Sequence, residues 1–169
     1  MSVTGYIYDT SVLSALLDGA HQRHPDIARA VASLPDDASH FVSAVSLAEL
    51  TFGVRMSSAF APSRLPALEQ MLIDVCAYGV LEVGHHTSAT YAELKTNLAK
   101  CYLSKANRRD RPRWLEEWPL NNRGQRLQVD ENDLWLCAQA KERSLTLLTA
   151  DSGMQRIADA DAEVMLLLI

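Results

Sequence analysis

Four acidic residues from distant parts of the chain occupy places where carboxylates could do chemistry. They are Asp9, Glu49, Asp133 and Asp151. Asp9 follows the apolar run at residues 3–8, and Asp151 follows a second apolar run at 145–149. Because ligands of parallel α/β sheets bind beyond the carboxyl ends of the strands, these positions favour a functional site. Hydroxyl side chains accompany the acids at Thr10, Ser11 and Thr149.

Converging carboxylates need a counter-charge, because like charges repel and raise one another's pKa. Oxygen ligands suit a hard cation such as Mg²⁺ or Mn²⁺, and the histidines and cysteines of this chain lack zinc-like spacing. Such ions can activate water and hold the leaving oxygen of a phosphodiester. We therefore expect the four acids to be ligands of one or two such ions, with the three hydroxyls within reach.

Each acid also has a purely structural explanation. Asp9 could cap the following helix, Ser46 and Glu49 have capping-box spacing, Asp133 suits a helix start, and Asp151 suits a turn. The hydroxyls could likewise be caps. Singly, these explanations are favoured. Together, acids placed around successive apolar strands form a pattern that capping does not require.

Strand and helix patterns alternate along most of the chain. Predicted strands lie at residues 3–8, 40–43, 78–83, 145–149 and 163–169. Predicted helices cover residues 12–17, 27–34 and 130–140. Three more are predicted from apolar residues that recur every three or four positions: Leu47, Leu50 and Val54; Leu65, Leu68, Leu72 and Val75; and Tyr91, Leu94 and Leu98. Thr87 or Ser88 is expected to cap the last of these helices. Trp135 is expected in the core and Lys95 on the surface. This order predicts one α/β domain, residues 1–169, with a parallel sheet covered by helices.

The composition limits the class of protein. The chain has 169 residues, a net charge of −5 and three widely spaced cysteines. Its longest apolar stretch, residues 164–169, is too short to cross a bilayer. We expect a cytoplasmic protein that makes no membrane contact, with no disulfide framework.

A basic segment is hidden by the acidic total. Residues 100–128, here called the basic arm, carry eight of the 16 Lys and Arg residues against three acids. The arm is thus +5 and the remainder −10. Lys and Arg bind phosphates, and Trp114 and Trp118 could stack on unpaired bases, so RNA is the expected partner. The RNA-binding candidates are Lys105, Arg108, Arg109, Arg111, Arg113 and Trp114.

The alternative for the basic arm is a solvated loop whose tryptophans pack on the domain or on a second subunit. One helical turn is expected at residues 114–117. The rest of the arm has Pro112, Pro119 and little periodicity.

Three stretches resemble the three conserved blocks of PIN-domain nucleases, and most of all VapC-like toxins of toxin–antitoxin pairs. They read YIYDTSVLSAL, SAVSLAELTFGV and ENDLWLCAQAKERSLTLLTAD. The resemblance implies a Mg²⁺- or Mn²⁺-dependent endoribonuclease on a Rossmann-like three-layer α/β/α fold with a central parallel sheet. It also implies Asp9, Glu49, Asp133 and Asp151 as the catalytic acidic quartet, with Thr10 or Ser11 and Thr149 as supporting hydroxyls. A homodimer and a small cognate antitoxin whose tail lies across the site are implied as well.

The chain departs from this family pattern in two places. The basic arm is long, which affects the choice of substrate, and Ser152, Gly153 and Met154 replace the apolar residues usual after the last acid. The main competing hypothesis is a non-catalytic PIN-like module that binds RNA or protein. A phosphotransfer domain with Asp9 as nucleophile is weaker, because Ser11 stands where a second acid is often needed.

Overall fold

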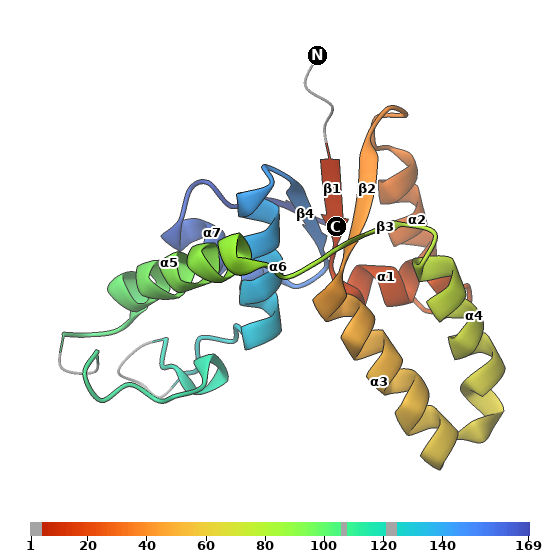
Figure 1. Cartoon of the computed structure of the whole chain (residues 1–169), viewed down its shortest axis with the longest axis horizontal. Coiled ribbons are helices and arrows are strands. Elements are labelled where there is room, and N and C mark those ends of the chain that lie inside the picture. Colours follow the sequence, from red (N-terminus) through yellow and green to blue (C-terminus); the bar gives the residue numbers. More distant parts are fainter. Residues whose placement is uncertain (1–4, 106–107, 121–124) are drawn as a thin grey trace.

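A five-stranded, fully parallel sheet runs through the computed structural model, which describes residues 5–105, 108–120 and 125–169 (Figure 1). The sheet order is β3-β2-β1-β4-β5. The strands are β1 (Gly5–Tyr8), β2 (Ser39–Ser43), β3 (Gly79–Leu81), β4 (Thr146–Thr149) and β5 (Met165–Leu168). All five predicted strands are therefore present, although residues 3 and 4 of the first lie outside the described ranges.

Helices connect the strands in the alternating order that the sequence predicts. The helices are α1 (Thr10–Leu17), α2 (His24–Ala32), α3 (Ala44–Phe60), α4 (Leu65–Val75), α5 (His85–Tyr102), α6 (Glu131–Glu142) and α7 (Gln155–Ala160). Short 3₁₀ turns lie at η1 (Pro62–Arg64), η2 (Leu115–Glu117) and η3 (Ser152–Met154). Helix α7 was not predicted, because six residues carry too little periodicity to be distinguished from a loop.

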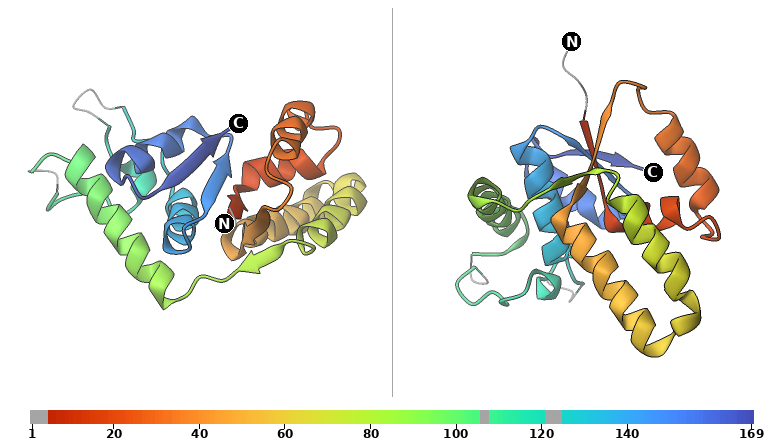
Figure 2. Two further views of the ribbon diagram at one scale, coloured as in Figure 1. Left: turned by 90° about the horizontal axis from the view of Figure 1, so that it is seen from above. Right: turned by 45° about the vertical axis from the view of Figure 1, so that its right-hand side comes forward.

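Two apolar cores lie on opposite faces of the sheet and make a three-layer α/β/α arrangement (Figure 2). Ile7 and Leu147 face α5, α6 and α7, whereas Tyr8 and Leu148 face α1 to α4. Because successive strand residues point to opposite faces, a strand covered on both sides is apolar throughout. The predicted fold class is thus confirmed.

The start of α3 decides the place of Glu49, and the caps of α3 and α5 differ from those the sequence suggests. Ser43 caps α3, with its Oγ accepting a hydrogen bond from the Val45 amide at 2.9 Å. The alternative explanation of Glu49, a capping box with Ser46, does not hold, since both residues are inside α3 and Ser46 is fully buried. Neither Thr87 nor Ser88 is the N-cap residue, because α5 begins at His85 after Gly84, but Thr87 contributes to the cap, since its Oγ1 accepts a hydrogen bond from the Gly84 amide at 3.2 Å.

The basic arm is attached to the domain. Its first residues belong to α5, which runs to Tyr102, and η2 confirms the predicted helical turn. Leu115, Trp118 and Leu127 are buried in the core beside α5 and α6. The expectation that Trp118 stacks on bases is therefore wrong, and the alternative that it packs on the domain is correct. Arg123 lies outside the described residues.

The arm and the α3–α4 pair project beyond the same end of the sheet, on either side of it, in two views of the molecule (Figures 1 and 2). This is the end at which β1, β2 and β4 finish and at which α3 and α6 begin. No helix in the described part of the chain is both long and apolar enough to span a membrane.

Candidate active site

Asp9 is a buried carboxylate that two hydroxyls hold at the end of β1. Ser11 Oγ donates to Asp9 Oδ2 at 2.6 Å, and Thr149 Oγ1 donates to the same oxygen at 2.9 Å. The residue is 6% exposed and occupies the N-cap position of α1, yet its side chain makes no capping hydrogen bond. Capping therefore does not explain this acid.

Thr149 joins the ends of two neighbouring strands. Its fully buried hydroxyl donates to Asp9 and accepts a hydrogen bond from the Asp151 amide at 3.0 Å. The backbone supports the same junction, because the Asp9 amide donates to the Leu148 carbonyl at 2.9 Å. The geometry thus fixes the Asp9 carboxylate at the carboxyl edge of the sheet.

Glu49 lies on α3, and both of its carboxylate oxygens are hydrogen-bonded. Thr10 Oγ1 donates to Oε2, and Asn132 Nδ2 donates to Oε1 at 2.6 Å. These partners lie in the first turns of α1 and α6, so three helices meet at this side chain. Asn132 was not among the predicted site residues, because an amide in an acidic helix start resembles an ordinary capping residue.

Asp133 lies in the first turn of α6 and forms a capping box with Asp130. The Asp133 amide donates to Asp130 Oδ1 at 2.8 Å, and the Asp130 amide donates to Asp133 Oδ2 at 3.0 Å. Burial raises the pKa of Asp133 to about 7, and the charges of Asp130, Asp9 and Asp151 add to the increase. The hydrogen bond from the Asp130 amide acts in the opposite direction. Asp133 therefore combines a structural cap with proximity to two of the predicted acids.

Asp151 is exposed and has a clear structural role. Its Oδ1 accepts a hydrogen bond from the Gly153 amide at 2.7 Å and caps the 3₁₀ turn η3. A β-carbon at Gly153 would lie 2.5 Å from the Gln128 carbonyl oxygen, so this turn passes close to the end of the arm. The turn explanation holds for this acid, although its charge still reaches Asp133.

The acids share one edge of the sheet without forming a closed ligand cage. Among the described residues, no three His, Cys, Asp or Glu side chains are grouped so that they could enclose a metal ion. Nor does any described Lys, Arg or His form an ion pair with Asp9, Glu49, Asp133 or Asp151. Mg²⁺ keeps several of its own waters and needs few protein oxygens. This oxygen-only, negatively charged edge therefore fits a hydrated hard cation.

The basic candidates lie away from these acids, on the arm. Arg108 donates to the carbonyls of Lys100 and Leu103, and Arg111 donates to the carbonyl of Arg108 at 2.9 Å. Arg113 lies over the Trp114 ring at 4.8 Å, and Trp114 is 52% exposed. Lys105 and Arg109 are exposed.

Two further expectations change at the junction of α5 and α6. Lys95 is not an isolated surface group, because its Nζ donates to Glu131 Oε1 and, at 2.9 Å, to Tyr91 Oη. Tyr91 Oη in turn donates to Glu131 Oε2. Trp135, expected in the core, is only partly buried and stacks on Tyr91 with ring centroids 4.0 Å apart.

Comparison with known proteins gives the family. The sequence model of the PIN domain matches residues 6–160, so the chain belongs to the PIN domain family. No curated protein matches it significantly. The family assignment confirms the resemblance that the three sequence blocks carry.

Solved structures of toxin–antitoxin complexes share this fold. VapBC-5 of Mycobacterium tuberculosis, a member of the VapBC family of toxin–antitoxin systems, is 25% identical with a TM-score of 0.64, covering 98% of this chain and 99% of that one. VapBC2 of Rickettsia felis, bound to a promoter DNA fragment, is 19% identical with a TM-score of 0.68 and 98% coverage of both chains. VapBC-1 of Haemophilus influenzae is 20% identical with a TM-score of 0.65 and the same coverage.

Proposed function

We propose that this PIN domain protein is a metal-dependent endoribonuclease and the toxin of a VapBC-type toxin–antitoxin pair. The observation that carries the proposal is the Asp9 carboxylate, which is buried, unused as a helix cap and held by hydroxyls from the first turn of α1 and the end of β4. Membership of the PIN domain family and the similarity to VapBC-5 support it.

The acids would hold Mg²⁺ or Mn²⁺ through Asp9, Glu49, Asp133 and Asp151. When bound, such an ion supplies Lewis acidity and an activated water for phosphodiester hydrolysis. Ser11 and Thr149 orient Asp9, and Thr10 and Asn132 orient Glu49. These partners fix the carboxylates before the ion arrives, which lowers the entropic cost of assembling the site.

The partners follow from the same assignment. RNA would contact the basic arm, including Lys105, Arg108, Arg111, Arg113 and Trp114. A small cognate antitoxin would inhibit the protein, which would act as a homodimer in the cytoplasm. Growth inhibition on expression, relieved by co-expression of a small open reading frame directly upstream, is the expected genetic behaviour.

Two substitutions test the activity. Asp9→Asn and Asp133→Asn should each reduce RNA cleavage by more than the roughly 10–100-fold that loss of an outer-shell partner costs. Asp36→Asn changes an exposed acid outside the site and should leave cleavage unchanged. Cleavage of cellular RNA in Mn²⁺, with folding checked by circular dichroism, is the measurement. Cleavage that continues unchanged in excess EDTA would reject the proposal.

One observation favours an alternative function, a PIN-like module that binds RNA or protein without cutting. Within the described residues the carboxylates do not form a three-ligand cluster. A protein that binds RNA in Mg²⁺ or Mn²⁺ and never cleaves it would establish this alternative.

A further inference from the structure

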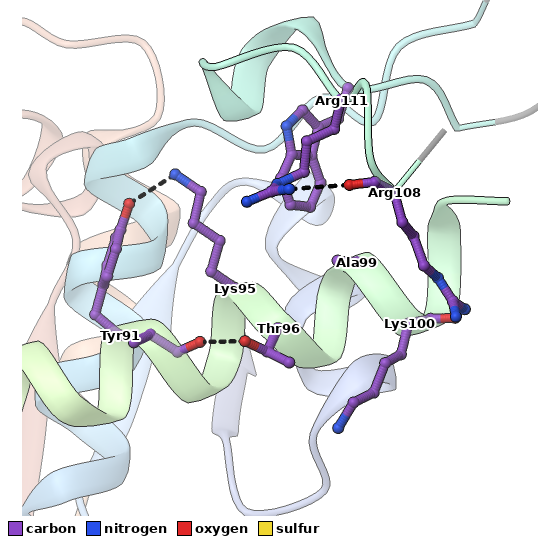
Figure 3. Close-up of a pocket in the computed structure, with 9 residues that line it drawn as sticks. Tyr91, Lys95, Thr96, Ala99, Lys100, Arg108 and Arg111 are labelled. Atoms are coloured by element: carbon purple, nitrogen blue, oxygen red, sulfur yellow. Dashed lines mark hydrogen bonds between the residues drawn. The ribbon is translucent and has the colours of Figure 1, made fainter. Parts of the chain in front are cut away.

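Two adjoining hollows lie between α5 and the basic arm, away from the carboxylates. One has a volume of about 430 Å³ and includes Lys95, Lys100, Arg108 and Arg111 in its lining, and the other, also about 430 Å³, is lined by Lys95, Arg111, Pro112 and Arg113. Lys95 extends upward from α5 and Arg111 approaches from the arm (Figure 3). The two hollows adjoin at these two residues, and together we call them the basic groove.

The charge of the basic groove is uniformly positive. Five cations and no acid line the two hollows. Lys95 is neutralised by Glu131, and Arg108 is engaged by main-chain carbonyls. In the part of the chain that the structure describes, Lys100, Arg111 and Arg113 form no ion pair with an acid. Arg111 and Arg113 thus line the groove with no anion to balance them, and Lys100 lies at its rim, where its Nζ donates to Asn97 Oδ1 at 3.3 Å (Figure 3).

Lys95 connects the basic groove to the acidic edge. Glu131, its partner, is the first residue of α6 and stands two positions before Asp133. The Glu131 carboxylate also accepts a hydrogen bond from the Leu115 amide at 3.3 Å, which fixes the arm against the same helix start. The inner end of the groove therefore borders the helix turn that carries Asp133.

The outer end of the basic groove carries an exposed aromatic ring. Arg113 lines the second hollow, and its guanidinium lies over Trp114, which is 52% exposed. Unpaired bases stack on such rings, while Lys and Arg pair with the phosphates between them. An acidic peptide supplies carboxylates for the cations but no base to stack on the exposed ring, so the combination favours single-stranded RNA.

We propose that the basic groove binds a single-stranded segment of RNA and guides it to the acidic edge. The inference rests on the proposed ribonuclease function and names the surface that selects its substrate. Lys100, on α5, becomes an RNA-binding residue that the sequence did not suggest. Arg109, although it is exposed on the same arm, lines neither hollow and should contribute little.

The test compares two charge-neutralised forms of the full-length protein. Binding of a fluorescently labelled, random-sequence single-stranded RNA is measured as a function of salt in an Asp9→Asn background, which keeps the RNA intact. Lys100→Gln with Arg111→Gln should weaken binding by roughly tenfold or more and reduce the salt slope by about 0.7 for each phosphate that is no longer neutralised. Arg109→Gln should leave both quantities near those of the parent.

A conservative variant separates charge from folding. Arg111→Lys keeps the positive charge and should retain most of the RNA affinity, whereas Arg111→Gln should not. If the double variant and Arg109→Gln bind RNA equally, the groove proposal is overturned. Polyglutamate binding that the double variant loses, with RNA binding unchanged, would assign the groove to an acidic protein segment and also overturn it.

The two proposals fail in different ways. If wild-type protein cuts RNA but the double variant binds it as tightly as the parent, the nuclease proposal is supported and the groove proposal is rejected. If no RNA is cut but the double variant loses RNA affinity that Arg109→Gln retains, the groove proposal is supported and the nuclease proposal is rejected.

Discussion

The carboxylates of Asp9 and Glu49 accept hydrogen bonds mainly from side chains of other elements. Ser11 and Thr149 hold Asp9, while Thr10 and Asn132 hold Glu49. Such partners orient an acid without removing its negative charge, unlike a salt bridge with Lys or Arg. At the level of single residues, the edge therefore keeps the charge that a cation needs and has the side-chain order that binding requires.

Asn132→Ala tests this positioning. Glu49 would lose the 2.6 Å hydrogen bond to Oε1, and we expect a 10–100-fold loss in Mn²⁺ affinity or in kcat, with little change in KM for RNA. Mn²⁺ titration and steady-state cleavage are the measurements. Gln70→Ala is a matched control, since that amide also donates to a carboxylate, that of Asp74, on the exposed side of α4. Equal effects of both changes would show that Asn132 does not position Glu49.

The first turn of α6 is the element at which the site is organised. Glu131 contacts α5 and the arm, and Asn132 contacts Glu49 of α3. The charges of Asp9 and Asp151 contribute to the raised pKa of Asp133. Three successive residues can do this because consecutive helical side chains point about 100° apart. One helix start thus joins the basic arm to the acidic edge.

Lys95→Met should weaken this junction. Burial opposes ionisation of Glu131, but the hydrogen bonds from Lys95 and Tyr91 hold its pKa below the ordinary value. Removing the cation from this partly buried pair should lower the free energy of unfolding by about 1–2 kcal/mol. Urea denaturation at neutral pH measures the change. Lys100→Met, on the exposed side of the same helix, should stay within about 0.5 kcal/mol of wild type, and similar losses in both variants would contradict the expectation.

At the scale of the whole molecule, the sheet separates two cores, and its carboxyl edge lies between two projections of different character. The α3–α4 pair carries exposed apolar side chains, among them Phe52, Phe60 and Ile73, and the basic arm carries positive charge. The basic arm has a net charge of +5 and the rest of the chain a net charge of −10, so the electrostatic potential differs strongly between the two parts of the molecule. If the protein is the ribonuclease proposed above, RNA would approach from the side of the arm.

The free energy of unfolding should depend on pH, because Asp133 titrates differently in the folded and unfolded states. Without metal, Asp133 has a pKa of about 7 in the folded protein, against an ordinary value of 3.8. Between these values the folded state retains a proton that the unfolded chain has released, so the free energy of unfolding should fall as pH rises from about 4 to about 7. Thermal unfolding in EDTA across this range measures the slope.

Asp133→Asn should flatten that slope, whereas Asp36→Asn should preserve it. Mg²⁺ favours charged carboxylates, so it should raise the Tm more at pH 8 than at pH 5. Superimposable pH profiles for wild type and Asp133→Asn would count against the shifted pKa. A Tm that Mg²⁺ leaves unchanged at pH 8 would count against ion binding at the edge.

The predictions from sequence were most accurate for elements with a strong period. Five strands and the long helices follow from apolar spacing, because each must bury one face or both. Boundaries were less accurate, as at α5, whose start at His85 depends on a glycine with no distinctive signal. Helix α7, with six residues, was missed because so short a segment shows no clear period.

The sequence by itself determined the alternation of strands and helices, the acids at the strand and helix ends, and the concentration of positive charge in one arm, because these depend on local spacing and composition. Tertiary structure alone decided which acids are caps and which are not, that Asn132 holds Glu49, and that Trp118 is buried while Trp114 is exposed. The physical reason is that these properties depend on contacts between residues far apart in the chain, and local spacing contains no information about them.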